Sequence, residues 1–252
     1  MNSIFRDMEQ LHERIWLFPM DDAGTQPNVG IVRGDRQTVL IDAGNSPRHA
    51  RMMMTEMAGR DFPPIDTVIY THHHWESVFG AMAYNAISVI AHETAINPLK
   101  SMSGRVWSAQ GLREESQRMP HLEARNVNIQ HAVGDWRDFR VVAPTLYVAH
   151  SLRIHLAPDV TLEVLHVGGQ HADDCLIVRM PQAGIAFLGD CLYPAPPYEG
   201  GRTAPDDRPR LALLEQIYSL GDERLIDART KPRTRAEFAD LLAYERARHD
   251  AP

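Results

Sequence analysis

The segment THHHWES, residues 71–77, follows directly on the short apolar run DTVIY at residues 66–70. An apolar run of this length, rich in β-branched residues, predicts a buried β-strand. If the chain stays extended beyond it, alternate side chains point the same way, so His72, His74 and Glu76 would converge on one side. Two imidazoles and a carboxylate suit a borderline cation such as zinc. The segment therefore predicts a metal site at a strand end, and an exposed polar loop is the alternative.

Two later segments repeat this arrangement of an apolar strand followed by polar residues. Residues 161–165 are apolar and lead into HVGGQHADD at 166–174, where a glycine pair would let His171 turn back toward the strand ends. Residues 185–188 are also apolar and lead into a glycine and then Asp190. Side chains placed at strand ends are held rigidly and meet at one rim of the sheets. We therefore expect the side chains of His171 and Asp190 to lie beside those of residues 72–76.

Predicted strands and helices alternate along the rest of the chain. The predicted strands are 13–19, 28–34, 37–44, 87–91, 145–148, 160–167, 174–180, 185–188 and 224–226, and the predicted helices are 47–59, 78–85, 211–220 and 234–248. Such an order gives mixed sheets covered by helices, and this number of strands requires two sheets between helical layers. Residues 194–209 are rich in proline and glycine and predict a loop.

Residues 92–143 have no clear strand pattern before about residue 139 and are polar, which predicts a helical insertion lying over the core. Trp107 in this insertion, with Tyr147 beyond its end, would wall a substrate pocket at the active-site edge. Ordinary packing is an equally good interpretation of Trp107.

The composition excludes several classes of protein. The 252 residues contain 26 Lys and Arg against 33 Asp and Glu, a formal charge of −7, which argues against non-specific binding of nucleic acid or an anionic membrane. Only Cys175 and Cys191 are cysteines, too few for a disulfide scaffold, and we interpret both as buried. No apolar run suggests a signal peptide or a membrane span, so we expect a cytoplasmic protein with one domain over 1–252. The sequence leaves the oligomeric state open, a homodimer included.

The order and spacing of these motifs resemble those of the metallo-β-lactamase superfamily. The resemblance extends from VLIDAG at residues 39–44 to PRTRAEF at residues 232–238, nearly the whole chain. It implies an α/β (α+β) fold, a four-layer αββα sandwich with the metal site at one edge of its two sheets, and a helical insertion around 92–143.

The resemblance also implies roles for individual residues. His72, His74 and His171 match the three histidines of the family's first metal site. Asp190 matches the carboxylate that normally bridges two metal ions. Asp42, in the family's Asp-X-Gly turn, would support the site from behind the ligands.

Three departures from the family pattern all fall on the second metal site. Glu76 stands where the family has Asp, Ser77 where it has a ligand histidine, and Arg229 where the last histidine would be. A serine is a poor zinc ligand beside imidazole, and a guanidinium cannot ligate because it stays protonated. We expect the second metal ion to be absent and Arg229 to supply its charge by pairing with Glu76 or Asp190. The alternative places Arg229 on a solvated basic loop.

These residues predict a metal-dependent hydrolase. One zinc ion held by three imidazoles leaves a position for water, whose pKa would fall to about 7. Asp190 would orient that water or become a fourth ligand, and Glu76 is a candidate general base or proton shuttle. The substrate would be a small molecule with an ester, lactone, thioester, amide or phosphoester bond. A degenerate member that acts as a binding or regulatory module is the alternative, and iron or manganese could replace zinc.

Overall fold

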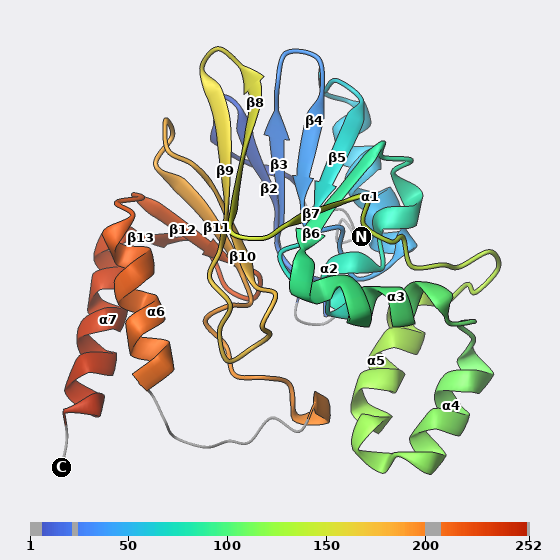
Figure 1. The fold of residues 1–252 in the computed structure, drawn as a ribbon. Helices are drawn as coiled ribbons and strands as arrows, with labels where there is room; N and C mark the ends of the chain where they lie inside the picture. Colours follow the sequence, from blue (N-terminus) through green and yellow to red (C-terminus); the bar gives the residue numbers. More distant parts are fainter. Residues whose placement is uncertain (1–6, 22–24, 200–207, 251–252) are drawn as a thin grey trace, which may run out of the picture.

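The computed structural model describes residues 7–21, 25–199 and 208–250. In Figure 1, two β-sheets pack face to face, and helices cover their outer faces. Among the described residues, the first sheet has seven strands in sequence order: β1 (Glu9–His12), β2 (Ile15–Phe18), β3 (Val29–Arg33), β4 (Thr38–Ile41), β5 (Ile65–Ile69), β6 (Ser88–His92) and β7 (Leu146–Val148). The second has six, in the order β13 (Arg233–Thr234), β12 (Arg224–Asp227), β11 (Ile185–Gly189), β10 (Leu176–Met180), β9 (Val160–His166) and β8 (Ser151–Ala157).

The helices divide between the two outer faces and the insertion. The α-helices are α1 (Pro47–Ala58), α2 (Trp75–Val78), α3 (Ile96–Gly104), α4 (Ala109–Arg118), α5 (Glu123–Val133), α6 (Arg208–Ser219) and α7 (Arg235–His249). Short 3₁₀ helices are η2 (Ala81–Ala83), η3 (Glu93–Ala95), η4 (Pro120–Leu122) and η5 (Pro197–Glu199). None of the described helices combines the length and apolar character that crossing a membrane requires.

Three buried apolar layers account for the four-layer architecture. The middle layer fills the space between the sheets, with Ile41 and Ile69 from one sheet and Val178 from the other. One outer layer packs α1 and the insertion on the first sheet, and the other packs α6 and α7 on the second, where Phe238 is fully buried. Helices α6 and α7 and helix α1 thus lie on opposite sides of the sandwich (Figure 1). The predicted αββα sandwich is confirmed.

Parallel neighbours bring polar residues to one edge of the sandwich. Strands β4, β5 and β6 run parallel, as do β11 and β12 in the second sheet. The carboxyl ends of parallel neighbours lie at the same edge of a sheet, so Asp42 after β4 and Thr71 after β5 are neighbours. Asp190 follows β11 in the facing sheet. The backbone N–H of Leu176 donates to the carbonyl of Thr71 at 2.7 Å, which joins the two sheets at this edge.

Most predicted elements are present, with four differences. The helix predicted over 78–85 is absent, because α2 ends at Val78 and only the 3₁₀ helix η2 follows. Strands β1, β8 and β13 were not predicted, because their side chains are largely polar or exposed at the sheet margins. The extended backbone expected through residue 76 ends at His74, because a helix begins at Trp75. The expected loop over 194–209 is described as far as Glu199 and contains η5, and residues 200–207 lie outside the described part of the chain.

The insertion is helical, as the sequence predicts. Helices α3, α4 and α5 form it, and Figure 1 shows α4 and α5 projecting beyond the sandwich. A buried polar network fastens α4 to α5: the Asn126 amide donates to the Leu112 carbonyl at 3.1 Å and to Glu115 at 3.0 Å. Because the Asn126 amide also accepts from Arg125 at 2.8 Å, its donors and its acceptor all have partners, and the network fixes the two helices to each other.

Gly189 permits the close approach of the two sheets at the polar edge. Its φ is +53°, and a Cβ atom built on it would lie 2.7 Å from Cβ of Thr71. Gly189→Ala should therefore destabilise the protein by about 3 kcal/mol or more, from left-handed strain plus overlap. Gly221 is the matched control, because its φ is +83° and no atom lies within 4 Å of the position that an added methyl group would take. Gly221→Ala should cost only about 1 kcal/mol. Urea denaturation measures both, and equal losses would show that overlap at Gly189 is unimportant.

Candidate metal centre

Three imidazoles from two sheets meet at the polar edge. His72, His74 and His171 are all buried, and one ring nitrogen of each lies within 4.8 Å of the others. Nδ1 of His74 is 2.9 Å from Nε2 of His171, and Nε2 of His72 is buried with no hydrogen-bond partner among the described residues. The structure thus brings together the three histidines that the sequence singled out.

Asp42 fixes the segment that carries the first two histidines. Its carboxylate accepts hydrogen bonds from the backbone N–H of Thr71 at 2.7 Å and from the Thr71 hydroxyl at 2.8 Å. The same hydroxyl lies 3.1 Å from Nδ1 of His72. Burial raises the pKa of Asp42 to about 7, although the bonds from Thr71 oppose the rise. Asp42 therefore supports His72 through Thr71. It lies behind the ligand histidines, where the sequence suggested.

His171 reaches the site because a glycine pair reverses the chain after β9. Gly168 and Gly169 have φ values of +58° and +134°, which L side chains rarely adopt. On its outer side, Nδ1 of His171 lies 3.0 Å from the carbonyl of Pro194, which accepts its proton and leaves Nε2 facing the site. The ring is therefore held in the tautomer that a metal ligand needs.

The protonation states of the histidines suit metal binding. Burial, with the neighbouring imidazoles, lowers the pKa of His72 well below its usual range, and burial lowers the pKa of His171 to about 4. Both rings are therefore neutral near pH 7 and keep a lone pair for a cation. One carboxylate oxygen of Asp190 lies 3.3 Å from Nε2 of His171 and 3.8 Å from Nε2 of His72. Neutral imidazoles converging beside a carboxylate form a donor set that fits zinc.

Glu76 does not join the three imidazoles as the extended-segment prediction required. His74 is the N-cap of α2, so Glu76 sits in the first turn of a helix and the alternation expected for residues 72–76 ends. That part of the prediction is wrong. The carboxyl group of Glu76 instead lines a cavity together with Asp190 and Arg229. Its Oε2 atom is buried with no hydrogen-bond partner in the described residues, and burial raises its pKa.

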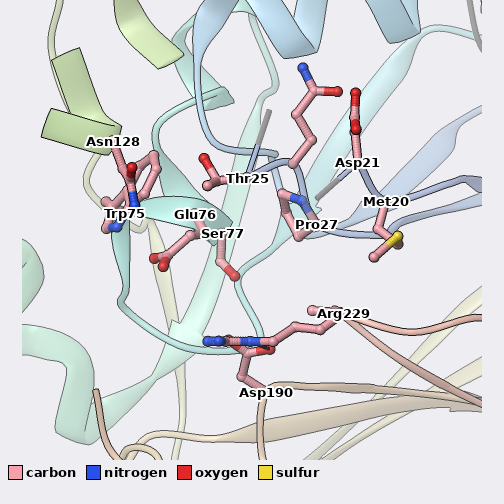
Figure 2. A pocket seen from close by; sticks show the side chains of 12 residues that line it. Met20, Asp21, Thr25, Pro27, Trp75, Glu76, Ser77, Asn128, Asp190 and Arg229 are labelled. Carbon is pink, nitrogen blue, oxygen red and sulfur yellow. Dashed lines mark hydrogen bonds and ion pairs between the residues drawn. The ribbon is translucent and has the colours of Figure 1, made fainter. Parts of the chain in front are cut away.

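Arg229 binds Asp190, one of the two partners that the sequence suggested. Nε of Arg229 donates to both carboxylate oxygens at 3.1 Å, and Nη2 donates to Oδ2. Figure 2 shows the guanidinium lying across Asp190, with Glu76 and Ser77 on the other side of the cavity. Burial opposes the charge on Arg229, but the bonds to Asp190 outweigh it and raise the pKa above its usual value. The alternative of a solvated basic loop is therefore wrong.

The loop that carries Arg229 is held by a second buried carboxylate, Asp227. Its oxygens accept the backbone N–H groups of Arg229 and Thr230, both at 2.8 Å, and the guanidinium of Arg233. Tyr193 donates to the same carboxylate at 2.9 Å and lies under the Arg229 guanidinium, 4.9 Å from Cζ to ring centroid. Arg229 thus reaches Asp190 from a preorganised loop.

Two cavities adjoin the imidazoles, and Trp75 lines both. The first, of about 250 Å³, is lined among others by Glu76, Ser77, Asp190 and Arg229. The second, of about 260 Å³, is lined by His74 and by residues of the insertion, Trp107 included. Tyr147 lines neither of them, so its expected place in the pocket wall is wrong.

Sequence reasoning missed a pair of ionic contacts on the outer side of the histidine run. Nε2 of His74 lies 3.1 Å from the carboxylate of Glu199, which is within ion-pair distance but outside hydrogen-bond geometry. Nδ1 of His73 forms a hydrogen bond with the carboxylate of Asp174 at 2.8 Å. Burial lowers the pKa of His73, but bonds to Asp174 and Glu199 outweigh it and raise the pKa to about 9. His73 therefore forms ion pairs with Asp174 and Glu199 on the outer side of His74. The proline-rich loop 194–209 was the only signal for Glu199.

Comparisons with known proteins agree with this geometry. A family model described as the metallo-β-lactamase superfamily matches residues 22–230. The fold is similar to that of a metallo-β-lactamase from Pontibacter korlensis, with TM-score 0.64 and 16% identity over 95% of this chain and 98% of that one. A metallo-β-lactamase family protein from Thermus thermophilus has TM-score 0.61 and 20% identity, over 95% and 81% of the two chains.

A third similar structure belongs to a much longer protein. It is the stereoselective inverting sec-alkylsulfatase Pisa1 from Pseudomonas sp., with TM-score 0.67 and 18% identity over 95% of this chain and 41% of that one. The chain thus spans less than half the length of the alkylsulfatase. A search of curated protein sequences found no significant match. At such low identities the structural likeness shows the fold alone.

Glu199 should strengthen metal binding by holding the outer nitrogen of His74. Because carboxylates on the outer side of ligand histidines fix the ring and raise its basicity, Glu199→Gln should weaken zinc affinity about tenfold or more. Competition with a chromogenic chelator measures the affinity. Glu215→Gln, which removes an exposed carboxylate paired with Arg246, is the control and should leave the affinity unchanged. Equal affinity of the Glu199 variant and the unsubstituted protein would contradict the assignment.

Proposed function

Because this chain belongs to the metallo-β-lactamase superfamily, we propose that it is a metal-dependent hydrolase with a single zinc ion. The observation that supports the proposal is the convergence of three buried imidazoles beside Asp190, which is itself paired with Arg229. The proposed substrate is a small molecule with an ester, lactone, thioester, amide or phosphoester bond. A cytoplasmic location stays a prediction from the sequence.

His72, His74 and His171 would hold the zinc ion. Bound by three imidazoles, zinc supplies a water of pKa about 7 and polarises the oxygen of the bond to be cleaved. The outer contacts of the rings, to Thr71, Glu199 and Pro194, keep each imidazole oriented before substrate arrives. Such preorganisation lowers the reorganisation that the reaction would otherwise require.

Asp190 and Arg229 would act together in this mechanism. Asp190 faces the imidazole nitrogens at 3.3 and 3.8 Å, where it can accept a proton from a water and orient its lone pair toward the substrate. The guanidinium sets a positive charge against this buried carboxylate through three hydrogen bonds. Nη1 of Arg229 has no acceptor within the described part of the chain, so it can donate to a substrate oxygen that gains negative charge.

Glu76 is the proposed proton carrier for the leaving group. It lines the same cavity as Asp190 and Arg229, and its buried Oε2 has no partner among the described residues. Because burial raises its pKa, a larger share of this carboxyl group holds a proton near neutral pH than an exposed glutamate would. A group in that state can give a proton to a departing oxygen or nitrogen and recover it from water.

Metal analysis and a substrate screen test the assignment. We expect about one zinc per chain, and activity on at least one of a panel of esters, lactones, β-lactams, phosphodiesters and alkyl sulfates. His72→Ala and His171→Ala should each lower kcat/KM by about 10³-fold or more, because each removes a ligand. His155→Ala, which removes a histidine from the exposed margin of β8, is the control and should keep full activity.

Each outcome distinguishes the alternatives. A metal-free protein after purification without chelators would favour the binding or regulatory module. A coloured protein that contains iron would favour redox chemistry. Activity that survives both histidine substitutions unchanged would show that the imidazoles are not the catalytic centre.

Metal stoichiometry tests the replacement of the second metal ion by Arg229. The double variant Ser77→His/Arg229→His removes the guanidinium and adds two imidazoles near Asp190 and Glu76, so it should bind close to two zinc ions per chain. The single variant Ser77→His is the control and should stay near one, because the guanidinium still occupies Asp190. Mass spectrometry under native conditions counts the ions. A double variant that stays at one ion would argue against a latent second site.

A further inference from the structure

The second cavity connects the imidazoles to the helical insertion. At one end it is lined by His74 and Tyr198, and at the other by side chains of α3, α5 and the segment that follows α3. The Tyr198 ring lies 6.1 Å from the His74 ring, and Cζ of Arg125 lies 5.3 Å from the Tyr198 ring. Arg125 is therefore one aromatic ring away from the candidate metal ligands.

The insertion end of this cavity carries a net positive charge. Arg105 and Arg125 both line it, and they share one carboxylate: Glu115 accepts from Arg105 at 2.9 and 3.1 Å and from Arg125 at 2.9 Å. Two guanidinium groups against one carboxylate leave one uncompensated positive charge. Both arginines are largely buried, so water screens this charge less than at an exposed site.

Arg125 has hydrogen-bonding capacity that the described residues do not use. Its Nε and Nη2 bind Asn126 and Glu115, whereas Nη1 has no acceptor in the described ranges. This unused donor indicates that the cavity can hold a ligand with a hydrogen-bond acceptor at its insertion end.

The middle of the cavity is apolar and rigid. Met102, Trp107 and Ile129 line it. The indole N–H of Trp107 donates to the Met102 carbonyl at 2.9 Å, and its ring packs edge-on to Phe79 at 4.8 Å. The ring cannot turn away without losing both contacts, so this wall is formed before a ligand binds. An apolar part of a ligand can pack against this wall.

We propose that this cavity recognises substrates that carry an anionic group, joined through a short apolar body to the bond that is cleaved. The position of the cleaved bond rests on the proposed hydrolase function. Binding of the anionic group does not depend on that function. Glu199 lines the metal end, where its carboxylate lies 3.1 Å from Nε2 of His74. Its negative charge disfavours an anion at that end, so the anionic group is directed to Arg125.

Binding of a matched pair of probes tests the proposal without turnover. Hexane-1-sulfonate has an anionic group on a six-carbon chain, and hexan-1-ol is its neutral counterpart. In isothermal titration calorimetry of the metal-loaded protein, the sulfonate should bind at least about tenfold more tightly than the alcohol. The affinity for the sulfonate should fall as NaCl is raised, and the affinity for the alcohol should not fall.

Four variants locate the anion. Arg125→Met should abolish most of the tenfold preference, whereas Arg113→Met, an exposed arginine of α4, should retain it. A thermal melt checks that each variant is folded. If the Arg125→Met variant unfolds, Arg125→Lys replaces it in the test. Because lysine keeps a positive charge, the Arg125→Lys variant should retain part of the preference for the sulfonate. The proposal would be overturned if the Arg229→Met variant lost the preference for the sulfonate while the Arg125→Met variant kept it. That result would place the anion at the metal centre. Equal affinity of the two probes in the unsubstituted protein would overturn it as well.

The binding and activity experiments fail independently. A protein that prefers the sulfonate but hydrolyses nothing keeps the anion site and loses the hydrolase assignment. A protein that hydrolyses substrates but binds both probes equally keeps the hydrolase assignment and loses the anion site.

Discussion

A carboxylate buried between two sheets has to be compensated, and in this protein the compensation comes from a guanidinium. Asp190 is 3% exposed, and the imidazoles beside it are neutral, so they offer no positive charge. Removing an ionised carboxylate from water without a partner costs several kcal/mol. Arg229 provides the charge through three hydrogen bonds. The geometry of the candidate metal centre, and the proposal of one ion in place of two, both follow from this pairing.

The sandwich architecture makes that pairing geometrically possible. Asp190 and the loop bearing Arg229 follow β11 and β12, which run parallel, so both leave the second sheet at the same edge. The histidine segment leaves the first sheet at the facing edge, and Gly189 lets the sheets approach closely there. Helices α1, α6 and α7 cover the outer faces. A site built from strand ends is rigid because each end is fixed by its ladder of hydrogen bonds.

The sequence could predict what depends on periodicity and residue chemistry. The apolar strand before residues 71–77 and the glycine pair before His171 were enough to predict that these histidines meet at one edge of the sheets. Because Arg229 cannot ligate a metal, the sequence also predicted that it pairs with a carboxylate. The helix that begins at Trp75 was not foreseen, because an alternating pattern cannot show where extension ends. Glu199 was also missed, since its contact to His74 joins two residues far apart in the sequence through a loop without periodicity.

Replacing a metal ion by a guanidinium changes what the site can select. A second ion could bind an anionic part of a substrate at the reaction centre itself, whereas most donors of Arg229 are already used on Asp190. An anionic substrate would then need another cation to orient it. The insertion provides one in Arg125, which lines the second cavity and lies against the Tyr198 ring. Trp75 lines both cavities, so it separates the reaction side, with Glu76 and Arg229, from the recognition side. Chemistry and specificity can therefore change independently, the first through loops at strand ends and the second through the inserted helices.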